Sequence, residues 1–102
     1  MPRVSIIIPS YNHELFIHEA IESALQQSYQ DLEIIITDDG STDNTVDLLK
    51  KVKDRRIRIF LHKTNKGAAL TTNSCIKHTT GEFISVLNSD DVFYPDKLEK
   101  QV

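Results

Sequence analysis

The apolar residues of this chain gather in four short runs, which are separated by longer segments with apolar residues at helical spacing. Val4–Ile8 ends at Pro9, and Leu32–Thr37 ends before an acidic turn. Both runs are mostly apolar and rich in β-branched residues, which is typical of strands buried on both faces. Ile57–Leu61 and Phe83–Leu87 predict a third and a fourth strand. Arg58, between Ile57 and Ile59, favours an edge position for the third strand.

The segments between these runs predict helices. Their shared apolar faces consist of Ile17, Ala20, Ile21, Ala24, Leu25 and Ser28 in the first, Val46, Leu49 and Val52 in the second, and Ala69, Thr72, Cys75 and Ile76 in the third. Asn12 is placed to cap the first helix, and Thr42 or Asp43 can cap the second. The third runs over 67–79 and stops before Gly81. The alternation predicts an α/β fold: a Rossmann-like, three-layer α/β/α arrangement with a parallel sheet and right-handed crossovers.

Polar residues follow every predicted strand. In an open parallel sheet, ligands bind beyond the carboxyl ends of the strands. The segments at these ends are Pro9-Ser10-Tyr11-Asn12, Asp38-Asp39-Gly40-Ser41, His62-Lys63-Thr64-Asn65 and Asn88-Ser89-Asp90-Asp91. Side-chain oxygens are frequent in them, and two of the segments contain an acidic pair. We therefore expect one polar site at one rim of the sheet.

The acidic pairs suggest a divalent metal ion. Carboxylates held together at one rim repel each other unless a cation or hydrogen-bond donors offset the repulsion. Mg²⁺ and Mn²⁺ take oxygen ligands and, in nucleotide sites, are often held by one or two carboxylates and phosphate oxygens. One metal-binding carboxylate at Asp90 or Asp91, together with a diphosphate, fits this description.

Each motif alone also has an ordinary structural explanation. Residues 38–41 and 88–91 are typical of turns that lead into helix caps. Tyr11 is compatible with an exposed loop aromatic, and residues such as Asn65, Gly67 and Asn73 with a cap, a turn and a helix surface. Cys75 lies on an apolar helical face, and the four histidines lack metal-ligand spacing, so structural roles are favoured for all five.

Composition narrows the class of protein. With 102 residues, of which 39% are hydrophobic and 26% charged, the chain suits one small globular domain. A net charge of -3 with scattered basic residues disfavours nucleic acid as the main ligand. No apolar run approaches the roughly 20 residues that span a bilayer, so we predict no transmembrane segment. The single Cys75 favours a reducing compartment, and we expect a cytoplasmic location, with the inner face of the membrane as an option for a full-length form.

The motifs occur together in a specific order. They are Ile6-Ile7-Ile8-Pro9-Ser10-Tyr11-Asn12, the run from Asp38 to Thr45, Asn65-Lys66-Gly67 with Asn73, Gly81-Glu82, and Asn88-Ser89-Asp90-Asp91. This combination closely resembles the nucleotide-sugar-binding half of the family-two inverting glycosyltransferases of the GT-A fold, over nearly the whole chain. The resemblance implies metal-dependent transfer of a sugar, with inversion, from a nucleotide-diphosphate sugar such as a UDP-sugar to an acceptor hydroxyl. The sheet order expected for such a fold is 3-2-1-4.

The resemblance also implies roles for individual residues. Tyr11 would stack near the base, Asp39 would accept hydrogen bonds from the base edge, and Asp38 would support that loop. Asp90 would bind the metal ion, and Asp91 could share this role. The implied donor-nucleotide residues are Pro9, Ser10, Tyr11, Asn12, Asp38, Asp39, Gly67, Asn73, Asn88 and Ser89, and the implied metal ligands are Asp90 and Asp91.

Two positions depart from the family pattern. Asn88 stands where the family usually has an Asp, so this side chain can hydrogen-bond a ribose hydroxyl but contributes no charge. Thr72 stands where relatives often carry an Arg, which removes a cationic contact to base or phosphate. Lys66, at the start of the third helix, is an alternative source of that positive charge.

The resemblance implies that residues 1–102 are the donor-binding part of a longer enzyme. The family's general base and its acceptor site, for a carbohydrate or lipid-linked acceptor, are expected beyond residue 102, and we expect the fragment alone to be inactive. Self-association through apolar residues near 83–87 or 93–98 is also expected. A non-catalytic nucleotide- or sugar-binding module of the same fold is the alternative. A phospho-acceptor receiver domain is disfavoured, because its acidic pair should follow the first strand.

Overall fold

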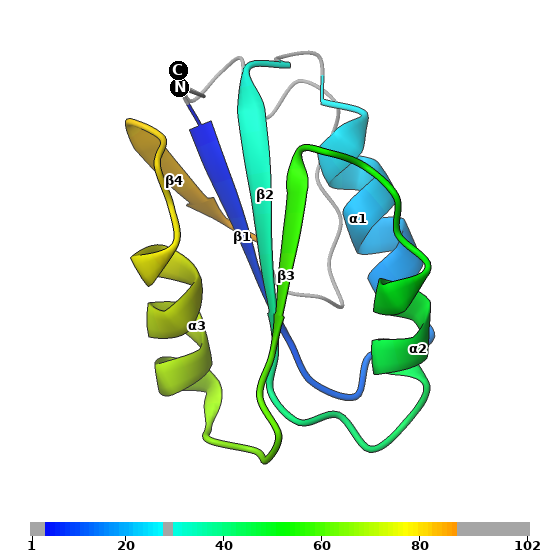
Figure 1. Cartoon of the computed structure of the whole chain (residues 1–102). Coiled ribbons are helices and arrows are strands. Elements are labelled where there is room, and N and C mark those ends of the chain that lie inside the picture. The colour runs from blue at the N-terminus through cyan, green and yellow to red at the C-terminus, as the bar shows by residue number, and fades with distance from the viewer. Residues whose placement is uncertain (1–3, 28–29, 88–102) are drawn as a thin grey trace.

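The computed structural model describes residues 4–27 and 30–87. Its elements are β1 (Val4–Ser10), α1 (Ile17–Leu25), β2 (Leu32–Asp38), α2 (Thr45–Lys50), β3 (Ile57–Leu61), α3 (Ala68–Lys77) and β4 (Phe83–Val86). The strands form one parallel sheet in the order β3-β2-β1-β4 (Figure 1). The predicted α/β alternation, the parallel sheet and the strand order are confirmed.

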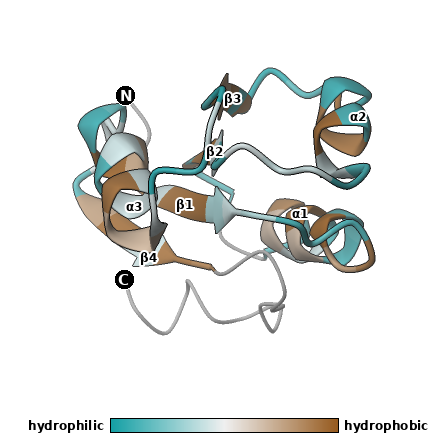
Figure 2. Ribbon diagram, turned by 90° about the horizontal axis from the view of Figure 1, so that it is seen from below, coloured by the Kyte–Doolittle hydropathy of each residue, from teal (hydrophilic) through white to brown (hydrophobic). Residues whose placement is uncertain are grey.

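Helices cover both faces of the sheet. α1 and α2 lie on one face and α3 on the other (Figures 1 and 2). Successive residues of a strand point to opposite faces, so a strand covered on both sides is apolar at most positions. Ile6 and Ile34 pack with the core on the α1 side, whereas Ile7 and Ile35 pack with Cys75 on the α3 side. The predicted burial of the first two strands on both faces is therefore confirmed.

The third and fourth strands form the two edges of this sheet. β3 is only partly buried, as the charged residue within its sequence predicts. β4 pairs with β1 and leaves Phe83, Ile84 and Val86 exposed. The strand ends one residue before the predicted Leu87, whose backbone N–H nevertheless donates to Ile7 O at 2.9 Å. Among the described residues, no helix is long and apolar enough to cross a bilayer.

The helices differ from the prediction in two respects. Asn12 does not cap α1, which begins only at Ile17, because the Asn12 side chain bonds a different loop. On α3 the buried residues are Thr71 and Cys75, which share a face because they are four positions apart. Ala69 and Ile76 of the predicted face are exposed, and Ser28 of the first predicted face lies outside the described residues.

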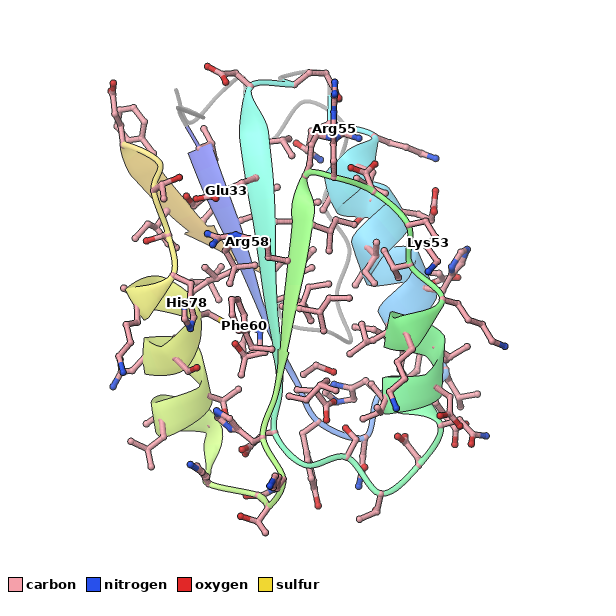
Figure 3. All side chains as sticks on the ribbon, in the orientation of Figure 1. Glu33, Lys53, Arg55, Arg58, Phe60 and His78 are labelled. Carbon is pink, nitrogen blue, oxygen red and sulfur yellow. The ribbon has the colours of Figure 1, made fainter. Side chains whose placement is uncertain are left out.

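A polar cluster fixes the α3–β4 connection to the end of the sheet where β1 and β2 begin, opposite the carboxyl ends of the strands. Glu33 Oε2 accepts hydrogen bonds from the Ser5 hydroxyl and the Thr80 backbone N–H, each at 2.6 Å. Arg58 approaches Glu33 Oε1 at 3.4 Å and also donates to the His78 carbonyl (Figure 3). Burial raises the pKa of Glu33, but the hydrogen bonds from Ser5 and Thr80 and the Arg58 charge outweigh it, so the pKa lies below its usual value.

Gly81 belongs to the same junction. A Cβ at this position would lie 2.7 Å from the Ser5 hydroxyl oxygen and 2.8 Å from the Ser5 backbone nitrogen. Its backbone N–H donates to the same hydroxyl at 2.8 Å. The sequence predicts Gly81 as a helix stop, but α3 already ends at Lys77, and the residue serves instead for a close approach of two backbones.

Candidate functional site

The carboxyl ends of β1, β2 and β3 lie in register at one edge of the sheet. Ser10 pairs with Asp38, and Asp38 pairs with Leu61. The ladders continue one residue further, because Asp39 N donates to Ser10 O and His62 N donates to Asp38 O, both at 2.8 Å. Three polar loops therefore leave the sheet side by side, as the parallel alternation predicts.

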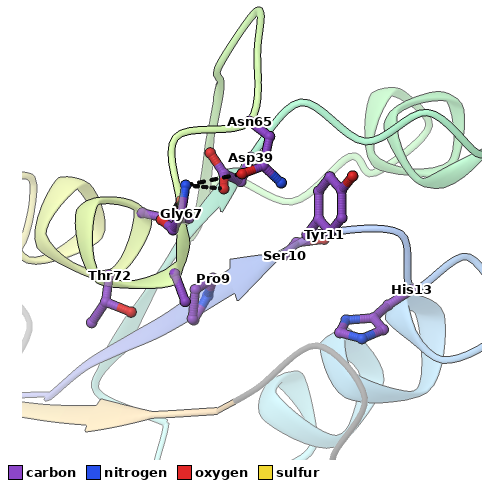
Figure 4. A pocket seen from close by; sticks show the side chains of 10 residues that line it. Pro9, Ser10, Tyr11, His13, Asp39, Asn65, Gly67 and Thr72 are labelled. Carbon is purple, nitrogen blue, oxygen red and sulfur yellow. Dashed lines mark hydrogen bonds between the residues drawn. The ribbon is translucent and has the colours of Figure 1, made fainter.

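A cavity of about 390 Å³ lies among these loops (Figure 4). The residues that line it are Pro9, Ser10, Tyr11, His13, Asp39, Asn65, Gly67, Ala68, Thr71 and Thr72. They come from the end of β1, the β1–α1 connection, the residue that follows β2, the β3–α3 connection and the start of α3. The structure thus brings together five of the predicted site residues, namely Pro9, Ser10, Tyr11, Asp39 and Gly67.

Asp39 is the charged group of this cavity. Its carboxylate is almost fully buried. Oδ1 accepts hydrogen bonds from His62 Nδ1 at 2.9 Å and from Lys66 N at 2.8 Å, and Oδ2 accepts one from Gly67 N at 2.9 Å. Burial raises the pKa of Asp39, but these donors, with a contribution from Thr71, outweigh it and hold the pKa below its usual value. The group is therefore an anion at neutral pH.

Asp38 is bonded to the turn that follows β2. This fully buried carboxylate accepts hydrogen bonds from Ser41 N at 2.9 Å and from the Ser41 hydroxyl at 2.5 Å. The Ser10 hydroxyl lies 3.4 Å from Asp38 Oδ1. Asp38 does not line this cavity, and its hydrogen bonds to Ser41 hold the turn after β2.

Asn12 joins the first two loops. It has a backbone φ of 51°, a left-handed conformation that Asn tolerates better than most residues. Its Oδ1 accepts hydrogen bonds from Thr42 N at 2.8 Å and Asp43 N at 3.4 Å, and its own N–H donates to the Ser41 hydroxyl. The Asn12 side chain is thus occupied by the neighbouring loop. It shapes the wall next to Tyr11 without itself lining the cavity.

Two glycines have backbone conformations that the site requires. Gly40 has a φ of 73°, and a Cβ there would lie 2.7 Å from Thr64 C and 2.8 Å from Asn65 N. The loop after β2 therefore packs directly on the loop after β3. Gly67 has a φ of 100° with open space around its Cβ position, and its N–H donates to both Asp39 Oδ2 and Asn65 Oδ1 (Figure 4).

The other predicted site residues either do not line the cavity or lie outside the described residues. Asn73 is exposed on α3 and does not line the cavity. Asn88, Ser89, Asp90 and Asp91 lie outside the described residues. Within 4–27 and 30–87, no group of three or more histidine, cysteine, aspartate or glutamate side chains is arranged to hold a metal ion. Cys75 has the predicted structural role, because it is buried and burial raises the pKa of its thiol.

Structural roles are predicted for all four histidines, but two of them lie at the site. His13 lines the cavity, and His62 is bonded to Asp39. The absence of metal-ligand spacing is a valid argument against a metal role, but it is silent about hydrogen bonding. The available signal for His62 was its position directly after the third strand, on the rim where ligands bind.

Comparisons with known proteins agree with this geometry. A family model described as glycosyl transferase family 2 matches residues 5–102. The chain is 43% identical, over 104 residues, to an uncharacterized glycosyltransferase of Haemophilus influenzae, covering 100% of this chain and 42% of that protein. It is 44% identical, over 102 residues, to the Escherichia coli UDP-Glc:alpha-D-GlcNAc-diphosphoundecaprenol beta-1,3-glucosyltransferase WfaP, covering 100% of this chain and 41% of that one. It therefore spans less than half of either relative.

Two solved structures share the fold. S. aureus TarS 1-349 in complex with UDP superposes with a TM-score of 0.89 at 29% identity, over 97% of this chain and 30% of that one. The mannosyltransferase PcManGT from Pyrobaculum calidifontis, in complex with GDP-Man and Mn²⁺, superposes with a TM-score of 0.79 at 26% identity, over 90% of this chain and 28% of that one. The predicted GT-A relationship is confirmed.

Proposed function

The chain belongs to glycosyl transferase family 2, and from this premise we propose that its cavity binds the nucleoside part of a nucleotide-diphosphate sugar. One observation carries the proposal: a buried anionic carboxylate, Asp39, and a partly exposed aromatic ring, Tyr11, line the same cavity. An aromatic ring offers an apolar surface on which a base can stack, and a carboxylate accepts hydrogen bonds from base N–H groups. Together they suit the two kinds of surface that a nucleobase has.

The expected nucleotide is uridine diphosphate. Uracil has an N–H between two carbonyl groups, and a carboxylate is a suitable acceptor for it. TarS is solved in complex with UDP and with UDP-GlcNAc, and WfaP is named for UDP-Glc, which supports the same choice here. Thr72 lines the cavity at a position where the family resemblance implies an Arg. Leaving His13 aside, Asp39 is therefore the charged side chain among the residues that line it.

We extend the proposal to a divalent metal ion, for which Mn²⁺ in PcManGT is a precedent. β4 runs parallel to β1, so its carboxyl end faces the same edge of the sheet as Tyr11, and the acidic pair follows four and five residues after the end of β4 in the sequence. The carboxylate oxygens of Asp90 and Asp91 are ligands that suit Mn²⁺ or Mg²⁺. When bound, such an ion supplies positive charge that stabilises a departing nucleoside diphosphate.

For the longer protein we propose sugar transfer with inversion to an acceptor hydroxyl. The residues of this chain would bind and orient the donor, with Asp39 fixing the base and the loops after β1 and β3 enclosing it. We propose that the acceptor site and the general base lie outside residues 1–102. The lipid-diphosphate acceptor in the name of WfaP supports a lipid-linked or carbohydrate acceptor. A cytoplasmic location is part of the same proposal.

Titration calorimetry with UDP, in the presence and absence of Mn²⁺, tests the proposal. We expect binding that Mn²⁺ strengthens, and we expect Tyr11→Ala and Asp39→Asn each to weaken it by about tenfold, the value of one good interaction. Tyr11 is a partly exposed loop residue, so its replacement should leave the fold intact. Asp47→Asn on the exposed side of α2 is the matched control for the loss of a carboxylate and should bind UDP normally.

Three results would contradict the proposal. A wild-type protein that binds no UDP would refute the nucleotide site. Equal binding by wild type, Tyr11→Ala and Asp39→Asn would move the site away from this cavity. Binding that is unaffected by Mn²⁺, and by Asp90→Asn in its presence, would refute the metal part alone.

A further inference from the structure

His62 contacts the carboxylate that we propose as the base acceptor. Its Nδ1 lies 2.9 Å from Asp39 Oδ1, and the His62 and Asp39 side chains are only 16% and 4% exposed. The backbone of His62 is fixed too, because its N–H continues the β2–β3 ladder by donating to Asp38 O. The imidazole is therefore held against Asp39 by the sheet itself. His62 is not one of the residues that line the cavity in the described part of the chain.

The chemistry of this contact determines where the hydrogen lies. Asp39 is ionised, so its oxygens can only accept hydrogen bonds. Nδ1 of His62 must therefore carry the shared hydrogen, whether the ring is neutral or protonated. In the neutral ring this leaves Nε2 without a hydrogen.

The two oxygens of Asp39 are used unequally. Oδ1 accepts from both His62 Nδ1 and Lys66 N. Oδ2 accepts from Gly67 N, while the nearby Thr71 hydroxyl donates to Gly67 O at 2.9 Å. Each carboxylate oxygen has two lone pairs, and His62 and Lys66 fill those of Oδ1. A base would therefore bond Oδ2, in competition with Thr71, which also contributes a side-chain hydrogen bond to this carboxylate. The orientation of the Asp39 carboxylate thus determines whether a base would meet Oδ1 or Oδ2.

We propose that His62 is a positioning residue, which aims Asp39 Oδ2 at the base and so makes the site select uracil over cytosine. This rests on the proposed nucleotide site. Uracil carries a hydrogen on ring nitrogen 3, whereas cytosine has a lone pair there and an amino group beside it. A carboxylate held in one orientation repels that lone pair. Without His62 the carboxylate keeps its donors from the β3–α3 loop, Lys66 N and Gly67 N, and we expect it to turn enough to accept from the amino group, which weakens the preference.

The test compares UDP and CDP binding by calorimetry, in Mn²⁺, for wild type, His62→Leu and His62→Asn. An Asn side chain can place its amide N–H near the position of Nδ1, whereas Leu removes the donor. We expect wild type to prefer UDP, His62→Leu to lose about tenfold in UDP affinity with CDP affinity unchanged or raised, and His62→Asn to stay within about threefold of wild type. His18→Leu, on the exposed surface of α1, is the matched control.

Nitrogen NMR of the free protein adds a readout that needs no nucleotide. We expect the His62 Nδ1 resonance to be that of a protonated nitrogen, and a bare Nδ1 would overturn the proposal. Equal losses of UDP and CDP affinity in a folded His62→Leu variant would show a merely structural role and would also overturn it. If wild type binds UDP and His62→Leu keeps the full preference for UDP, only this inference fails. If wild type binds neither nucleotide, the proposed function fails and this inference with it.

Discussion

Two buried carboxylates, those of Asp39 and Glu33, accept hydrogen bonds from donors in distant parts of the chain. Asp39 is held by the β3–α3 loop, and Glu33 by residues of β1, β3 and the α3–β4 connection. In both cases burial raises the pKa, and the hydrogen bonds more than compensate. The charged form is thus the form that the folded state prefers.

This preference predicts acid sensitivity. The pKa values of Glu33 and Asp39 are lower in the folded state than their usual values of 4.5 and 3.8, so the unfolded chain takes up protons first as the pH falls. The stability from these groups is therefore complete above about pH 5 and is lost progressively below it. We expect urea unfolding to give a constant free energy near neutrality and a steady decline in acid.

Glu33→Gln isolates one contribution to that decline. Glu33 accepts hydrogen bonds from four donors, namely the Ser5 hydroxyl, the Thr80 N–H, the Thr80 hydroxyl and Arg58. We therefore expect Glu33→Gln to cost about 1–3 kcal/mol at pH 7 and to flatten the acid decline. Glu19→Gln, on the exposed surface of α1, is the control. A Glu33→Gln profile parallel to wild type down to pH 3 would contradict this assignment.

At the scale of elements, the loops after β2 and β3 depend on each other through Gly40. Gly40 and Gly67 both have positive φ, but of these two only Gly40 has a Cβ position too close to backbone atoms, 2.7 Å from Thr64 C and 2.8 Å from Asn65 N. An alanine at Gly67 would therefore meet only the strain of a left-handed backbone, whereas an alanine at Gly40 would meet that strain and a steric overlap. They also share the same site, since one contacts the loop that carries Asn65 and the other bonds Asp39.

We expect Gly67→Ala to destabilise the protein by about 1–2 kcal/mol, the cost of a left-handed conformation. Gly40→Ala should cost about 1–3 kcal/mol more, because the β3–α3 loop must move to admit the methyl group. Urea unfolding measures both variants. Equal losses of stability would mean that the two loops are not in the close contact described here.

The strands and the site's location could be predicted from sequence, whereas several contacts could not. The apolar runs of β1 and β2 are local signals, and the parallel alternation places their carboxyl ends on one rim. The local pattern predicts Asn12 as a helix cap, but the partners of its side-chain oxygen, the backbone N–H groups of Thr42 and Asp43, are about thirty residues away. The contact between His62 and Asp39 cannot be predicted for the same reason, since only the β2–β3 pairing brings the two residues together. The buried face of α3 includes Thr71, which hydropathy does not mark as a core residue.

At the scale of the whole molecule, β4 presents an apolar edge. Phe83, Ile84 and Val86 are 43%, 45% and 48% exposed. Exposed apolar side chains on an edge strand favour association with another chain. We therefore keep the prediction that the protein self-associates through this edge.

Light scattering over a range of concentrations measures that association. We expect the apparent mass to rise with concentration in wild type, and the paired substitutions Ile84→Thr and Val86→Thr to suppress the rise. Leu15→Thr removes an even more exposed apolar side chain from the β1–α1 loop and should leave association unchanged. A wild-type protein that stays monomeric at high concentration would contradict the prediction.

The central claim is that a nucleotide binds in the cavity between the β1–α1 and β3–α3 loops. Amide NMR spectra recorded during titration with UDP and Mg²⁺ locate the ligand residue by residue. We predict the largest shifts at Tyr11, Asp39 and Gly67, with little change at Lys51 and Val52 in the groove between α1 and α2. Shifts confined to that second groove, or no shifts at saturating UDP, would contradict the account.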